Sequence, residues 1–166
     1  KHDVAIIVIG EKPYSEGLGD IRSGDHVIVE AGSQIKGSMN VLEPYGNTLE
    51  LARLHPEDLL AIKSITKKGI PAVVLLVSGR PLLVNRELDA CGAFVAAWLP
   101  GSEGQGISDV LFGDFDFQGK LSFAWPNSND QSSGNDCCHG APLFPCGYGL
   151  NYPKPQSIQS LKSLSA

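Results

Sequence analysis

The chain has 166 residues, of which 42% are hydrophobic and 19% are charged. This composition is typical of a single globular domain with a core of its own. The net charge of −5 argues against nucleic acid or an anionic membrane as a partner, and no apolar run is long enough to span a bilayer.

The first part of the chain contains one predicted strand and a long polar segment. Residues 4–9 are continuously apolar and β-branched, which predicts a strand buried on both faces, as in a parallel sheet. Residues 11–47 are polar and rich in Gly, Ser, Asp and Glu, with a short strand predicted at 26–29. So long a loop in a compact domain is usually functional.

Alternating helices and strands follow. A helix is expected to begin around Pro56, with Glu57 and Asp58 near its positive end, and to close at Gly69. The pattern then predicts strands at 72–77, 93–97 and 120–124 and helices at 85–90 and 107–112. This order predicts an α/β fold, a three-layer α/β/α sandwich with a mostly parallel, flavodoxin-like sheet.

Ligands of such sheets are met by loops beyond the carboxyl ends of the strands, here 10–20, 78–81 and 98–106. The last loop carries Trp98, Ser102 and Glu103 among glycines. A carboxylic acid beside an aromatic ring suits sugar chemistry, because it can protonate a glycosidic oxygen. The glycines do not follow a phosphate-binding pattern. From the loop alone, Glu103 is equally a cap of the following helix.

The other two loops add candidate polar residues. Glu11, Tyr14 and Glu16 follow the first strand and could bind sugar hydroxyls or raise the pKa of the acid, although a solvated turn would use the same residues. Arg80 follows the second strand, where a structural ion pair is the favoured role. The four cysteines and four histidines show no metal-ligand spacing, so we expect no metal and no cofactor.

Six segments in order resemble the second domain of glycoside hydrolase family 3, chiefly its β-glucan exohydrolase and exo-β-glucosidase branch. They are AIIVIGEKPYSEG at 5–17, LVSGRPL at 76–82, AAWLPGSEG at 96–104, DVLFGD at 109–114, GKLSF at 119–123 and PLFPCGYGL at 142–150. In that family this domain is a six-stranded α/β sandwich beside a TIM-like barrel.

The resemblance implies a retaining hydrolase of β-glucosides or β-glucan oligosaccharides that is secreted or periplasmic. It implies that Glu103 is the acid/base and that Trp98, Ser102, Glu11, Tyr14 and Glu16 contact substrate. The nucleophilic aspartate would belong to a barrel outside this chain, so the chain alone is expected to be inactive. Residues 1–152 would form the sandwich domain without its first portion, and 153–166 a linker or tail. A non-catalytic sugar-binding module and a phosphate-binding flavodoxin-like domain are the alternatives.

Overall fold

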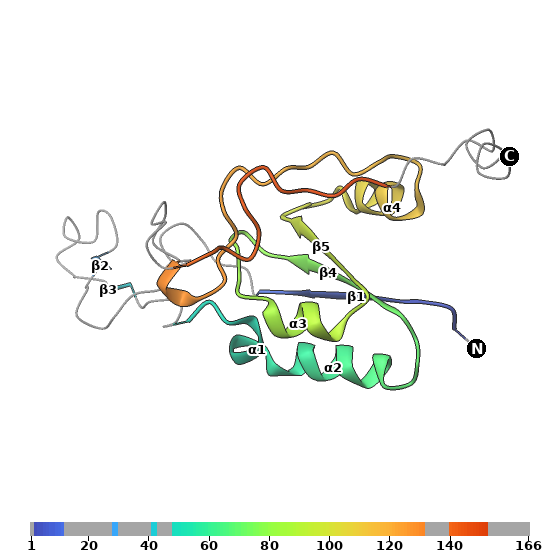
Figure 1. Cartoon of the computed structure of the whole chain (residues 1–166), viewed down its shortest axis with the longest axis horizontal. Helices are drawn as coiled ribbons and strands as arrows, with labels where there is room; N and C mark the ends of the chain where they lie inside the picture. Colours follow the sequence, from blue (N-terminus) through green and yellow to red (C-terminus); the bar gives the residue numbers. More distant parts are fainter. Residues whose placement is uncertain (1, 12–27, 30–40, 43–47, 132–139, 153–166) are drawn as a thin grey trace, which may run out of the picture.

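A computed structural model describes residues 2–11, 28–29, 41–42, 48–131 and 140–152 of the chain. Its centre is a parallel sheet of three strands, β1 (Ala5–Gly10), β4 (Ala72–Val77) and β5 (Ala93–Trp98), in the order β1-β4-β5 (Figure 1). A separate antiparallel pair joins β2 (Ile28–Val29) to β3 (Val41–Leu42). The predicted parallel α/β sheet is therefore confirmed for three of its strands, β1, β4 and β5.

Among the described residues, four α-helices accompany the sheet: α1 (Leu51–Leu54), α2 (Pro56–Thr66), α3 (Asn85–Ala90) and α4 (Gly104–Phe112). Helix α2 begins at Pro56 as predicted, with Glu57 and Asp58 in its first turn, and the chain turns at Gly69 with a positive φ of 74°. Helix α4 starts three residues before the predicted 107. Helix α1 was not predicted, since four residues are too few for a periodic pattern.

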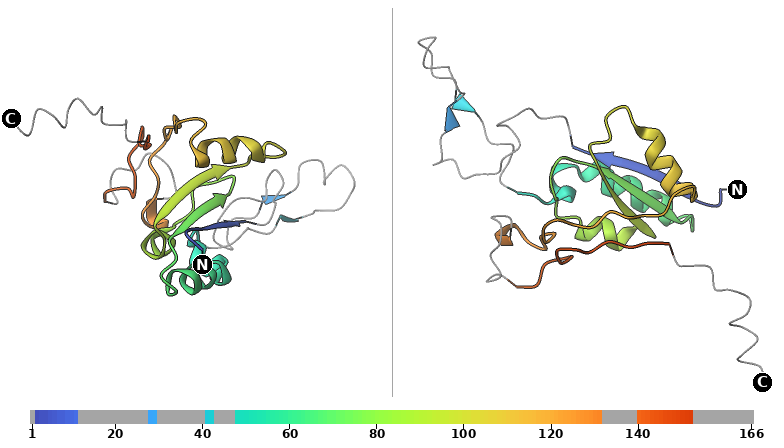
Figure 2. Two further views of the ribbon diagram at one scale, coloured as in Figure 1. Left: turned by 90° about the vertical axis from the view of Figure 1, so that its right-hand side faces the viewer. Right: turned by 90° about the horizontal axis from the view of Figure 1, so that it is seen from above.

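The helices lie on both faces of the sheet, as the three-layer prediction requires. Helices α2 and α3 lie on one side and α4 on the other (Figures 1 and 2). The α2–α3 side holds the main apolar core, because alternate strand residues point toward it. Its strand and helix members include Ile9, Ile62, Val74 and Leu76.

The other face of β1 departs from the sequence prediction. Residues 4–9 were expected to be buried on both sides, but the strand alternates: Val8 is 65% exposed and Ile9 only 5%. Within the described residues β1 is an edge strand that pairs with β4 alone. A continuous apolar run therefore shows which residues could be buried, whereas burial itself depends on what packs against the strand.

The predicted strand at 120–124 is also wrong. Leu121 exchanges backbone hydrogen bonds with Gly147 and Tyr148, and Trp125 forms an isolated antiparallel bridge with Phe144. These two contacts hold the segment beside residues 143–148 without a continuous ladder. Trp125, directly after this segment, is buried, whereas Phe123 within it is exposed. In the part of the chain that the structure describes, no helix is long and apolar enough to cross a membrane.

Candidate active site

The carboxyl ends of the three parallel strands meet at one edge of the sheet. Gly10 pairs with Val77, and Val77 pairs with Trp98, so the last residues of β1, β4 and β5 are neighbours. Two hydrogen bonds continue this contact: Glu11 N–H donates to the Val77 carbonyl and Ser78 N–H donates to the Trp98 carbonyl, each at 3.2 Å. The predicted site loops therefore leave the sheet side by side.

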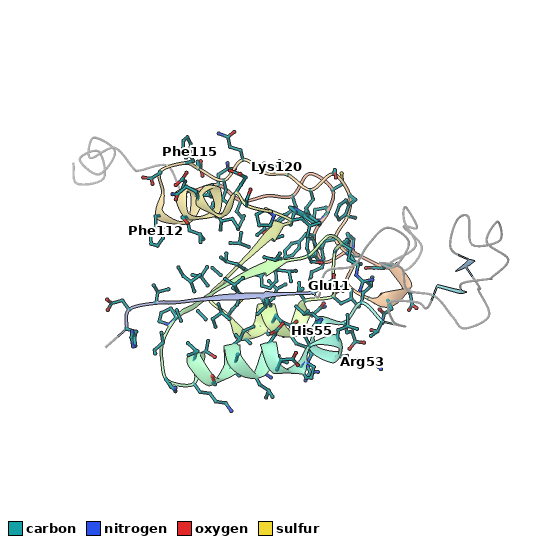
Figure 3. All side chains as sticks on the ribbon, turned by 180° about the vertical axis from the view of Figure 1, so that it is seen from behind. Glu11, Arg53, His55, Phe112, Phe115 and Lys120 are labelled. Carbon is teal, nitrogen blue, oxygen red and sulfur yellow. The ribbon has the colours of Figure 1, made fainter. Side chains whose placement is uncertain are left out.

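An ion pair occupies this edge. Arg80 donates from Nη2 to Oε1 of Glu11 at 2.6 Å and from Nε to the same oxygen at 3.0 Å. The other carboxylate oxygen, Oε2, accepts the hydroxyl of Ser78 at 2.6 Å, and that hydroxyl oxygen accepts the backbone N–H of Arg80 at 3.2 Å. The Glu11 side chain is 1% exposed and that of Arg80 is 12% exposed. Figure 3 shows Glu11 at the end of β1.

This geometry separates Glu11 from the other predicted sugar contacts. Both of its oxygens already accept hydrogen bonds from buried donors, and a sugar hydroxyl would have to displace one of them. Arg80 has the ion-pair role that its position after β4 suggested. Ser78 was missed in the sequence, although it directly follows the strand in the LVSGRPL segment.

Trp98 ends β5 in an unusual conformation. Its φ of 55° is left-handed, which is uncommon for a bulky residue, and the pairing of β4 with β5 shifts register between Leu76 and Val77 beside it. Its exposed ring lies 5.8 Å from that of Phe123 and 5.7 Å from that of Trp125. Phe123 is a second exposed aromatic residue here that sequence reasoning did not single out.

Glu103 lies five residues beyond Trp98, immediately before α4. It is exposed, and the Ser102 hydroxyl donates to its Oε1 at 3.0 Å. Glu103 is the N-cap residue of the helix, but its side chain makes no capping hydrogen bond. The Glu103 side chain therefore does not cap the helix, which was the alternative role, and its carboxylate remains accessible to a ligand.

The structure brings together Glu11, Arg80 and the backbone of Trp98. It places Ser102 against Glu103 just before α4. Two other sequence candidates, Tyr14 and Glu16, lie outside the described residues.

Comparison with known proteins identifies the family. The sequence profile of the glycosyl hydrolase family 3 C-terminal domain matches residues 1–152. The chain belongs to this family. Among solved structures, it resembles an exo-1,3/1,4-β-glucanase from a Pseudoalteromonas species with 42% identity and a TM-score of 0.71, over 95% of this chain and 22% of that one.

Two curated relatives match smaller parts of this chain than the glucanase does. A β-xylosidase from Formosa agariphila is 28% identical over 160 residues, 84% of this chain and 21% of that protein. A periplasmic β-glucosidase from Salmonella typhimurium is 34% identical over 115 residues, 55% of this chain and 15% of that protein. The chain thus spans about a fifth of the length of the Formosa β-xylosidase and of the Pseudoalteromonas glucanase.

Proposed function

We propose that this family 3 domain works in an exo-acting β-glucosidase or β-glucan glucohydrolase, where it supplies the acid/base carboxyl group. The observation that carries this proposal is the 42% identity to the Pseudoalteromonas exo-1,3/1,4-β-glucanase over nearly the whole chain. The meeting of the three site loops at one edge of the sheet supports it, since α/β sheets bind ligands there.

The reaction would be retaining hydrolysis. An aspartate of a barrel domain outside this chain attacks the anomeric carbon while the acid/base carboxyl protonates the departing glycosidic oxygen. The same group, now a carboxylate, removes a proton from water as water attacks and releases the aspartate from the glycosyl-enzyme. The two carboxyl groups of a retaining enzyme lie about 5 Å apart, so the domain edge must face the barrel.

Glu103 is our candidate for the acid/base, because it is accessible, is supported by Ser102 and follows the aromatic Trp98. Glu16 is the rival, since it follows the first strand in the sequence and is among the residues expected to contact sugar. Glu11 is the weakest of the three, because its carboxylate is enclosed by Arg80 and Ser78.

Glu103→Gln and Glu16→Gln in the complete enzyme test this assignment, with Glu57→Gln on the exposed side of α2 as the control. Loss of the acid/base slows β-glucan oligosaccharides far more than aryl glucosides with activated leaving groups, and azide restores turnover as β-glucosyl azide. This selective loss with azide rescue in Glu103→Gln supports Glu103 as the acid/base. The same result in Glu16→Gln alone assigns the acid/base role to Glu16. Its absence from both variants contradicts a proton donor on this domain.

The sugar and the compartment are part of the proposal. Two relatives are a β-xylosidase and a xylan 1,4-β-xylosidase, so a β-xyloside is the competing substrate. Matched aryl β-glucoside and β-xyloside assays of the complete enzyme decide between them; a larger kcat/KM on the xyloside would overturn the glucosidase assignment. We also propose a secreted or periplasmic location, which the named periplasmic relative supports and cell fractionation tests.

A further inference from the structure

We propose that Glu11, Ser78 and Arg80, together called the strand-end clamp, position the loop that carries Trp98 and Glu103. The clamp residues do not touch substrate in this scheme. They act through the backbone, and the catalytic half of the proposal depends on the function proposed above.

The clamp is more than a surface ion pair. The Glu11 carboxylate is 1% exposed and accepts a forked contact from Arg80 on one side and the Ser78 hydroxyl on the other. A buried ion pair contributes little net stability relative to apolar residues, but it specifies geometry, because either charge left alone in the interior is costly. The planar guanidinium adds directionality that a lysine lacks.

A short path leads from the clamp to the loop. Ser78 is held at its hydroxyl by Glu11, and its backbone N–H donates to the Trp98 carbonyl at 3.2 Å. Glu11 is itself held by its N–H on the Val77 carbonyl. The clamp therefore connects the ends of all three strands at the residue where the Glu103 loop begins.

The conformation of Trp98 explains why such support is needed. A tryptophan with φ of 55° is strained, and strained residues persist only where surrounding contacts define them. The loop then needs only five residues to reach Glu103. A change in the direction of the chain at Trp98 would move the carboxyl group directly, and a misplacement of about 1 Å can cost about 100-fold in rate.

The test compares Glu11→Gln, Arg80→Lys and Ser78→Ala in the complete enzyme with Arg53→Gln. Arg53 belongs to an exposed i,i+3 pair with Glu50 on α1, so it controls for loss of an ion pair on the same domain. Amide hydrogen exchange is read by mass spectrometry over residues 98–104, with α2 as the internal reference. Steady-state kinetics on an aryl β-glucoside supply kcat and KM separately.

We expect exchange over 98–104 to rise about tenfold or more in Glu11→Gln while α2 keeps its protection. We expect kcat to fall by about 10- to 100-fold with a much smaller change in KM. Arg80→Lys should recover only part of the loss, because it keeps the charge without the fork. Arg53→Gln should match the parent in both measurements.

Two results would overturn the clamp. One is unchanged exchange over 98–104 in all three variants; the other is an equal rise over 98–104 and α2, which indicates general destabilisation. If the parent enzyme cleaves no β-glucoside, the proposed function fails, but the exchange comparison still decides the clamp. Increased exchange with unchanged kcat would restrict the clamp to a structural role and contradict the catalytic half of the proposal.

Discussion

The indole N–H of Trp125 donates a 2.8 Å hydrogen bond to the carbonyl oxygen of Leu82, across 43 residues of sequence. Both residues are buried, and the backbone of Trp125 pairs with Phe144. This side chain thus helps to attach the irregular C-terminal segment to the core, as does Asn129, whose Oδ1 accepts the backbone N–H of Leu49 at 2.8 Å.

Trp125→Phe should destabilise the domain because it keeps an aromatic ring but leaves the buried Leu82 carbonyl without its donor. An unsatisfied buried group costs about 1–3 kcal/mol. The free energy of unfolding from urea titration measures the loss. Phe112→Leu, a change at an exposed aromatic residue labelled in Figure 3, should stay within about 0.5 kcal/mol. Equal losses in the two variants would contradict a specific role for the Trp125 hydrogen bond.

Glu87 makes domain stability fall as pH rises. It is 0% exposed, and neither carboxylate oxygen has a hydrogen-bond partner among the described residues. Burial raises the pKa of Glu87; the positive charges of Arg86 and Lys63 oppose this shift, while the negative charge of Asp58 adds to it. The folded chain therefore retains a proton that the unfolded chain releases near pH 4.5, and stability declines from there up to the folded pKa.

Glu87→Leu should accordingly stabilise the domain at neutral pH and flatten the decline. Unfolding free energies between pH 4 and pH 8 would show both effects, with exposed Glu57→Gln as the control. A smaller slope of the same sign should remain, because burial also raises the pKa of Asp58. A Leu variant whose stability at neutral pH is no greater than that of the parent would contradict the prediction.

Gly10→Ala should disturb the strand-end clamp sterically. A Cβ at Gly10 would collide with the backbone carbonyl of Val77, which is the acceptor for Glu11 N–H and has no rotamer to adopt. Such overpacking costs about 1–3 kcal/mol. Gly106→Ala in α4 meets nothing within 4 Å and should instead be neutral or stabilising. Thermal unfolding of the two variants would contradict this prediction if they shifted in the same direction.

The exposed apolar side chains and the unpaired edge of β1 should make the 166-residue chain self-associate. Ile6 and Val8 are exposed on a strand that pairs on one side only within the described sheet. Edges of this kind aggregate unless charged residues interrupt them. Val8→Lys should reduce association in sedimentation experiments more than Leu60→Lys, a matched change on the exposed side of α2. An equal effect would indicate that added charge alone is responsible.

The elements that the sequence predicted well carry local signals. The apolar runs of β4 and β5 form strands, and Pro56 with its acidic neighbours begins α2, because side-chain shape and helix-end electrostatics act within a few residues. The prediction failed at 120–124, since a strand needs a partner of matching register, and Leu121 and Trp125 find only separate contacts. The prediction that Val8 is buried was wrong for a similar reason, because among the described residues β1 pairs with β4 alone.

The sequence by itself determined the family resemblance, the α/β order and the loops that gather at the strand ends. Only the tertiary structure decided that Glu11 is enclosed by Arg80, 69 residues away, while Glu103 remains accessible beside Ser102. The physical reason is that a carboxylate's role depends on its donors and its exposure to water. For Glu11 those donors are supplied by Ser78 and Arg80 in the loop after β4, which is distant in the sequence, and no local pattern encodes their arrangement.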